Sequence, residues 1–221
     1  MPRARAAPVY DGAMVHVWPL TLRDGELVLR PLRRRDRADF ERLRTRNREW
    51  LRPWDATDPE APRRILPFSS VRRWNEQQAR LGLYLPLLIT VRGKPAGQIT
   101  AGPIQYGALR TATLGYWIDR DLAGAGLVPR SAALMIDHLF AELGLHRVEV
   151  TVRPENDASL RVVQKLHLRP EGTRRAAIHV DGAWRDHSVF ALTAEEVRTG
   201  DDGKGVLARL HREFFSDTPM G

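Results

Sequence analysis

Hydrophobic positions along the chain change their spacing several times, and each spacing indicates a helix or a strand. A short alternating run at residues 27–32 predicts a first strand, and residues 35–50 predict a helix with one polar face. Four prolines between positions 53 and 67 then interrupt the chain, so helical character returns only at residues 69–81. An irregular segment of this length is more typical of a functional loop than of a simple connection.

The middle of the chain carries a strand pattern. An apolar, partly β-branched run at residues 83–91 is followed by the turn sequence at residues 92–95 and by a second run through Ile99, which together predict a hairpin. Residues 111–118 are rich in threonine and aromatic residues, which favour strands. We therefore expect a three-stranded antiparallel meander that ends at Ile118.

Apolar residues after this meander recur at intervals of three and four, which places them on one face of a helix whose first turn holds Pro129: Val128, Ala132, Met135, Ile136, Leu139 and Leu143. Residues 146–152 predict a strand, residues 156–166 a helix, and residues 178–192 a hairpin that turns at Asp181-Gly182. The expected order is βααβββαβαββ, a mixed α/β (α+β) fold with a mostly antiparallel central sheet between helices.

The length of 221 residues suits one domain. We expect a tail at residues 1–13, a single domain at residues 14–198, and a C-terminal helix or tail at residues 199–221. The N-terminus lacks a secretory pattern, and no apolar run approaches the roughly 20 residues of a membrane helix. The sequence therefore predicts a soluble, cytoplasmic protein with no membrane partner.

Two residue types limit the possible chemistry. The chain has no cysteine, which excludes a thiolate nucleophile and a cysteinyl-acyl intermediate. His179 and His187 flank the last hairpin without metal-ligand spacing, so we expect no metal site and a surface role for both.

The net charge is +8, which favours anionic partners such as a phosphorylated cofactor or a ribosome. Only three of the 35 basic residues are lysines, and no RNA-binding pattern accompanies the arginines. A solvated basic face is therefore preferred to a nucleic-acid site.

A glycine-rich turn stands between the predicted strand at residues 111–118 and the helix that contains Pro129. Its residues Gly124 and Gly126 let the backbone approach a ligand, and N–H groups at a helix N-terminus bind phosphate without side chains. The arrangement suits a pyrophosphate, although two glycines alone also fit an ordinary left-handed turn.

The surrounding sequence resembles the GNAT superfamily of N-acetyltransferases, and within it the RimJ/RimL-like branch that acetylates ribosomal proteins. The resemblance covers about residues 26–192 and rests on residues 46–54 (RNREWLRPW), 114–118 (LGYWI), 145–149 (LHRVE), 156–159 (NDAS) and 181–186 (DGAWRD). The chain departs from the family pattern at Ala123 and Val128, which replace residues flanking the central glycines. His167 replaces a glycine, and costs about 1 kcal/mol if that position needs a positive φ.

The resemblance implies the GNAT fold and acetyl-CoA as cofactor. In such enzymes the pantetheine arm adds to the splayed edge of the strand before the turn, and the pyrophosphate binds the turn. Asn156 bonds the pantetheine or only caps its helix, and Arg161 reaches the adenosine phosphate or lies on a solvated face. The implied cofactor-binding residues are Tyr116, Trp117, Ile118, Ala123, Gly124, Ala125, Gly126, Leu127, Val128 and Asn156.

Direct attack of an amine on the thioester fits a chain without cysteine. The resemblance gives Ser159 the role of proton donor to the leaving thiolate, with helix capping as the alternative. Strand alternation places Glu149 toward the acceptor side, which makes it a candidate general base or an ion-pair partner. Glu49 and Asp55 are further candidates for the base. Trp50 and Trp54 are expected to wall the acceptor cleft or to pack in the core.

Three functions follow from these residues. The first is acetylation of the N-terminal α-amino group of a protein, such as a ribosomal protein, by a monomer or homodimer near the ribosome. The second is acetylation of a small amine. The third is a noncatalytic protein, either an acetyl-CoA sensor or a basic binding module.

Overall fold

The computed structural model describes residues 18–61, 66–200 and 204–215. The predicted tail at residues 1–13 and part of the predicted C-terminal segment lie outside these ranges. The elements, in chain order, are β1 (Leu22–Asp24), β2 (Leu27–Arg30), η1 (Arg34–Asp36), α1 (Arg37–Arg46), α2 (Arg48–Leu51), α3 (Phe68–Arg80), β3 (Leu85–Val91), β4 (Lys94–Ala101), β5 (Thr111–Ile118), η2 (Arg120–Leu122), α4 (Leu127–Ala141), β6 (Arg147–Val152), α5 (Asp157–Lys165), β7 (Arg169–Val180), β8 (Ala183–Thr193), α6 (Ala194–Gly200) and α7 (Val206–Phe214).

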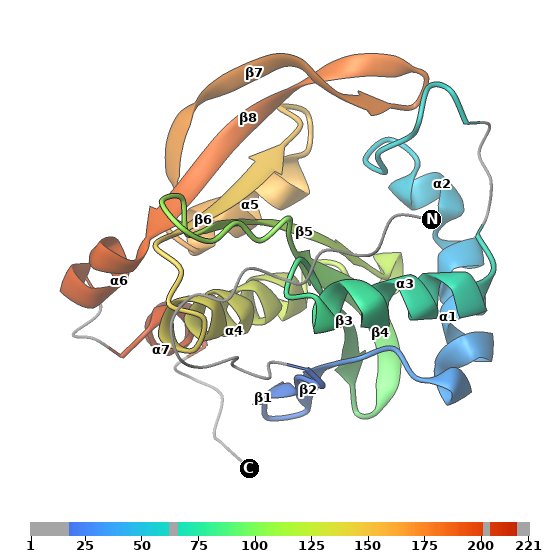
Figure 1. Ribbon diagram of the computed structural model, residues 1–221, viewed down its shortest axis with the longest axis horizontal. Coiled ribbons are helices and arrows are strands. Elements are labelled where there is room, and N and C mark those ends of the chain that lie inside the picture. The colour runs from blue at the N-terminus through green and yellow to red at the C-terminus, as the bar shows by residue number, and fades with distance from the viewer. Residues whose placement is uncertain (1–17, 62–65, 201–203, 216–221) are drawn as a thin grey trace.

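One eight-stranded sheet runs through the described residues in the order β1-β2-β3-β4-β5-β6-β8-β7 (Figure 1). Every neighbouring pair is antiparallel except β5 and β6, which are parallel. The predicted mixed, mostly antiparallel sheet and its meander β3-β4-β5 are confirmed. Between the two parallel strands the chain runs through η2 and the helix α4.

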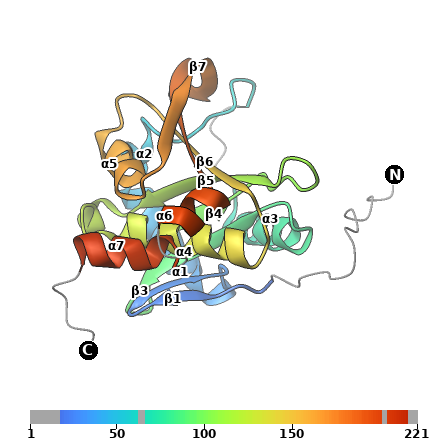
Figure 2. The same cartoon turned by 90° about the vertical axis from the view of Figure 1, so that its left-hand side faces the viewer.

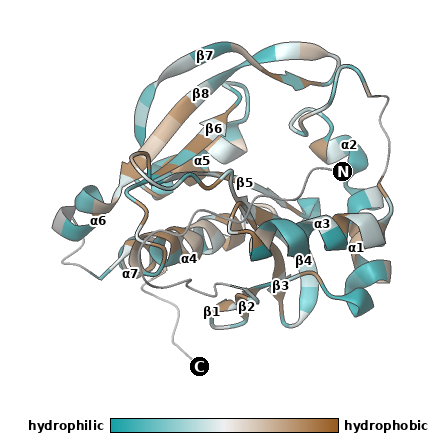
Figure 3. Ribbon diagram, viewed as in Figure 1, coloured by the Kyte–Doolittle hydropathy of each residue, from teal (hydrophilic) through white to brown (hydrophobic). Residues whose placement is uncertain are grey.

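Helices cover both faces of the sheet. Met135 and Ile136 of α4 are completely buried in the same cluster as Leu87 and Ile89 of β3, while Leu88, between them on the strand, packs with the side chains of α1 and α3 on the opposite face. Figure 3 shows the hydrophobic colour along α4, and Figure 2 shows α7 lying beside α4. The core thus fixes α4, whose N-terminus follows the glycine-rich turn.

The helix predicted at residues 35–50 is wrong as a single element, because it breaks at Asn47 into α1 and α2. The Asn47 side chain donates to the Leu43 carbonyl and to Asp119 Oδ1, both at 2.9 Å, and accepts from the N–H of Arg120 at 2.9 Å. Asparagine competes with helical hydrogen bonds in this way. The break ties the end of α1 to the segment that leads into the glycine-rich turn.

The last hairpin is longer than predicted, since β7 begins at Arg169 rather than at residue 178. Its first eight residues are exposed, so they show no alternation of hydrophobic positions to indicate a strand. The hairpin arches toward the chain that follows α2 (Figure 1). There Ala56 bridges to Val180, and the Thr57 N–H donates to the His179 carbonyl at 2.8 Å.

A buried ion pair makes stability depend on acid pH. Arg30 holds Asp36 through two hydrogen bonds of 2.7 and 2.8 Å, and the Arg33 N–H adds a third of 2.7 Å. Burial opposes ionisation of Asp36, but these donors outweigh it and lower the pKa of the carboxyl. A lowered folded-state pKa adds stability above the unfolded value of about 3.9, and the contribution is lost as the pH falls through the folded pKa.

We therefore expect the free energy of unfolding, measured with urea, to drop between pH 5 and pH 2. Asp36→Asn should cost about 3 kcal/mol at pH 7, because it leaves the Arg30 guanidinium buried without its counter-charge. It should also flatten the acid part of the profile. A variant with wild-type stability at pH 7 would contradict this account.

His167, which replaces a glycine of the family pattern, has a positive φ of 54°. Its ring contacts Glu213 at 2.9 Å, a partly exposed pair that contributes little. His167→Gly should therefore stabilise the fold by about 1 kcal/mol, since glycine adopts this conformation without steric cost. Thermal unfolding measures the change, and a lower midpoint would show that the contact with Glu213 outweighs the strain.

Candidate functional site

A cavity of about 1730 Å³ opens where the glycine-rich turn, the start of α5, the entry segment (residues 50–61) and β8 meet. Typical small-molecule sites measure about 300–1,000 Å³, so this one has room for two substrates. Trp50 and Trp54 of the entry segment line it, as predicted for acceptor-cleft walls. Arg153 fixes Trp54 from the β6 side, with its guanidinium 5.4 Å from the ring and its Nη1 donating to the Pro53 carbonyl at 2.7 Å.

The parallel strands β5 and β6 separate inside this cavity. Their register runs from Thr111 opposite Arg147 to Leu114 opposite Val150, and then stops, although β5 continues to Ile118. The backbone of residues 115–118 pairs with β4 on its other side only. A free strand edge of this kind can hydrogen-bond an extended amide chain, which is the environment that the pantetheine arm of CoA requires.

The glycine-rich turn has the geometry of an anion site. Gly124 and Gly126 have φ values of 83° and 73°, and Gly126 is the N-cap of α4 without any side-chain cap. Within the described residues, the N–H groups of Gly126, Leu127 and Val128 have no hydrogen-bond acceptor. These donors and the helix dipole suit a pyrophosphate, so the turn fits the group that the sequence assigned to it.

The other predicted cofactor residues lie around this path. Leu127 and Val128 are buried at the start of α4. Trp117 turns toward α1, where Arg44 lies 4.9 Å from its ring, while Arg161 lines the cavity. Of the predicted set, all but Ala125 line the cavity: Tyr116, Trp117, Ile118, Ala123, Gly124, Gly126, Leu127, Val128 and Asn156.

Two hydroxyl groups meet at the point where the strands separate. Tyr116 Oη and Ser159 Oγ are 2.8 Å apart, and both residues line the cavity. Burial raises the pKa of Tyr116 to about 12, against the opposing hydrogen bond with Ser159. The tyrosine is therefore protonated at any working pH, and its hydroxyl can donate to Ser159 Oγ and leave the serine proton for a third group.

Asn156 caps α5, because its Oδ1 accepts from the Ser159 N–H at 3.1 Å. The capping alternative thus applies to Asn156, while the Ser159 side chain contacts Tyr116 instead. Ser159 and Asn156 are brought together at the cavity wall. Asn156 still has its amide nitrogen for a ligand.

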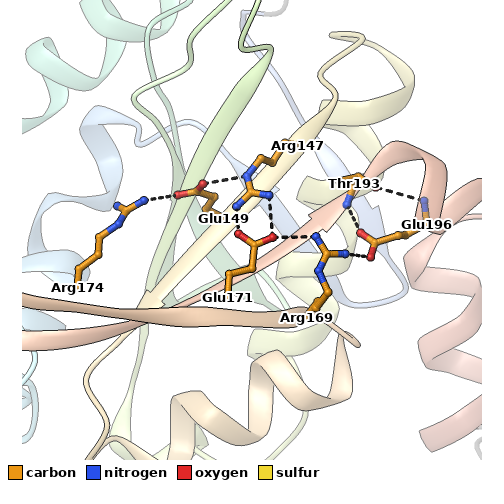
Figure 4. A network of polar contacts seen from close by, with 7 residues as sticks. All are labelled: Arg147, Glu149, Arg169, Glu171, Arg174, Thr193 and Glu196. Atoms are coloured by element: carbon orange, nitrogen blue, oxygen red, sulfur yellow. Dashed lines mark hydrogen bonds and ion pairs between the residues drawn. The ribbon is translucent and has the colours of Figure 1, made fainter.

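Glu149, the candidate base, lies apart from this group. Arg147 Nε and Arg174 Nη2 donate to its two oxygens at 2.9 and 3.2 Å. Figure 4 shows Glu149 between these two arginines, in a chain of contacts that continues from Arg147 to Glu171 and Arg169. Its side chain does not line the cavity. The geometry therefore favours its ion-pair alternative, and its role as a base stays an untested prediction.

The other acidic candidates lie nearer the cavity. Asp55 lines it and is bound by Arg44 at 2.7 Å, while Glu49 is held by Arg52 at 3.3 Å and does not line it. His187 does line the cavity with 6% of its surface exposed, so the predicted surface role of this histidine is wrong. His187 shares the buried face of β8 with Val189 and Ala191. The sequence alone does not show which face of this strand is buried, so it does not reveal that His187 lies inside.

No cluster of three or more His, Asp or Glu that could hold a metal occurs in the part of the chain that the structure describes. Among the same residues, none of the helices is long and apolar enough to span a membrane.

Comparison with known proteins identifies the family. The acetyltransferase (GNAT) domain matches residues 26–169. The probable N-acetyltransferase YjcK of Bacillus subtilis is 30% identical over 82% of this chain and 94% of its own length. The [ribosomal protein uS5]-alanine N-acetyltransferase of Escherichia coli is 26% identical over 86% of this chain and 98% of its own.

Solved structures agree with this match. RimJ of Mycobacterium smegmatis, in complex with a CoA disulfide, superposes with a TM-score of 0.81 and 35% identity over 88% of this chain and 95% of its own. A RimL ribosomal L7/L12 acetyltransferase bound to CoA has a TM-score of 0.69 at 22% identity, which bears on the fold. The predicted GNAT fold and the predicted N-acetyltransferase class are confirmed, and the chain belongs to the GNAT acetyltransferase family.

Proposed function

We propose that this enzyme transfers the acetyl group of acetyl-CoA to the N-terminal α-amino group of a protein, with a ribosomal protein as the first candidate. Such an acceptor would place it in the cytoplasm near ribosomes. The observation that carries the proposal is the hydroxyl pair of Tyr116 and Ser159, which lies between the free strand edge and the acceptor side of one cavity. The CoA bound in similar structures supports acetyl-CoA as the donor.

The charged residues of the cavity favour an acceptor amine that can enter uncharged over a polycationic acceptor. Six basic residues line the cavity, against five acidic ones, and two of the acidic residues are held in ion pairs, Asp55 by Arg44 and Glu155 by Arg153. A polyamine would need an excess of free carboxylates, whereas an α-amine, with a pKa near 8, enters partly neutral. This distinguishes a protein N-terminus from a polycationic small molecule.

In the proposed reaction the amine attacks the acetyl carbon directly and the thiolate of CoA leaves. Ser159 donates a hydrogen bond, and finally a proton, to the leaving sulfur, while Tyr116 donates to Ser159. The N–H groups of the turn hold the pyrophosphate, and the edge of β5 orients the thioester. No residue of the chain becomes acylated, which fits the absence of cysteine.

The test is an acceptor panel with acetyl-CoA: a peptide with a free N-terminus, the same peptide blocked at its N-terminus but with an internal lysine, and spermidine. A thiol reagent reports CoA release without background, because the protein has no cysteine. We expect release with the free N-terminus only. Release with spermidine alone would favour a small-amine acceptor, and tight CoA binding with no release would overturn the catalytic proposal.

A further inference from the structure

His187 is the one histidine among the described residues that line the cavity. It lies on β8, where Val189, two residues on, stands opposite Thr151 of β6. Because facing residues of paired strands share a face, His187 lies on the same side of the sheet as Thr151. Both residues line the cavity, next to the entry segment.

The hydrogen bond of the ring fixes its protonation. Nδ1 of His187 lies 3.1 Å from the carbonyl oxygen of Arg185. A carbonyl only accepts, so Nδ1 must carry the proton and donate it. The neutral ring then has its lone pair on Nε2, which has no hydrogen-bond partner among the described residues. Nε2 is the nitrogen left to accept a proton from the cavity.

The charged groups around His187 are engaged with other partners. Arg174, its register partner on β7, donates to Glu149 at 3.2 Å. Arg153, which follows β6, binds the Pro53 carbonyl and Glu155. On the entry segment, Asp55 is held by Arg44. The Asp58 carboxylate accepts a hydrogen bond from the Glu60 N–H at 2.9 Å.

We propose that His187 is the general base of the acetyl transfer. This inference rests on the proposed function and names the base that it lacks. As the N–C bond forms between the amine and the acetyl carbon, Nε2 accepts one amine proton. The C–S bond breaks, and the thiolate takes the proton of Ser159. Solvent in the open cavity reprotonates the serine, and the imidazolium releases its proton to solvent. The products are the acetamide and free CoA, with every proton accounted for.

The test is the pH profile of kcat/KM for the best acceptor of the panel, in the wild type and in His187→Gln. Glutamine fills similar space and cannot accept a proton at these pH values. We expect kcat/KM to fall on the order of 10²-fold at pH 8. The ratio should shrink as the pH decreases, because the wild type loses its base by protonation and the variant has none to lose.

The acid limb of the profile should therefore be steeper in the wild type than in the variant. His187→Ala should regain activity with added imidazole. His146→Gln is the matched control, since His146 is exposed and paired with Glu195 away from the cavity, and its profile should be unchanged. Thermal unfolding and CoA titration verify that each variant folds.

Three results would overturn the assignment. Parallel pH profiles, or a loss below about twofold in His187→Gln, would show that the ring only packs. A large loss confined to Glu149→Gln would assign the base to Glu149 instead. A wild type that releases no CoA with any acceptor would overturn the proposed function itself, which separates the two failures.

Discussion

Gly126→Val is expected to abolish CoA binding while the sheet and α4 remain folded. Gly126 has a φ of 73°, a conformation that a β-branched residue rarely adopts. A Cβ at this position would lie 2.6 Å from Cζ of Phe215, so both the turn and the residue after α7 would have to move. The free N–H groups of Leu127 and Val128 would then no longer converge on one anion.

Titration calorimetry with CoA measures the effect. We expect the dissociation constant to rise at least about 100-fold, which corresponds to about 2.7 kcal/mol. Gly144→Val is the matched control, because Gly144 has a similar φ of 60° beyond the other end of α4 and open space around its Cβ. It should lower the unfolding midpoint and leave CoA binding within about twofold. Equal CoA affinity in the two variants would show that the turn does not hold the phosphates.

The strands next to the site were predictable because burial shapes their sequence. Strand β5 has the predicted bounds of residues 111–118, and α3 differs from its prediction by one residue at each end. Strand β7 was not predictable over its first half, since both its faces are exposed there. The register of such a strand is set by its partner β8 and leaves no hydrophobic pattern.

The contacts between distant residues of the site could not be predicted. The sequence named Tyr116 for the cofactor edge and Ser159 for proton transfer, but 43 positions separate them and no periodicity relates the two. The Tyr116 hydroxyl lies 2.8 Å from Ser159 Oγ, so a phenol from β5 reaches the first turn of α5.

Glu149 and His187 show why the general base could not be chosen without knowing the hydrogen-bond partners of each side chain. Alternation placed Glu149 on the correct face of β6, but it could not show that Arg147 and Arg174 bind both oxygens of the carboxylate. The hydrogen-bond partner of His187 could not be predicted from the sequence, because it is the backbone carbonyl of Arg185 and not a side chain. Backbone acceptors are the same for every residue type and leave no trace in composition.

Ser159→Ala is expected to lower kcat on the order of 10²-fold, because the leaving thiolate loses its proton donor. The KM for acetyl-CoA should stay within about twofold, since the substitution changes neither the N–H groups of the turn nor the free edge of β5, which we propose to bind the cofactor. An interaction used only as the C–S bond breaks affects kcat and kcat/KM equally. The backbone of Ser159 is not at risk, because Asn156 bonds its N–H and not its side chain.

Tyr116→Phe tests the second half of the hydroxyl pair. It removes the donor to Ser159 Oγ but leaves the serine hydroxyl in place, so the expected loss in kcat is smaller, about tenfold. If the pair acts as one unit, Ser159→Ala and the double variant should lose the same activity, since Tyr116 acts only through Ser159. Ser70→Ala, at an exposed position outside the cavity, controls for serine removal. Losses that simply multiply in the double variant would show that the two hydroxyls act independently, with Tyr116 contacting the substrate directly.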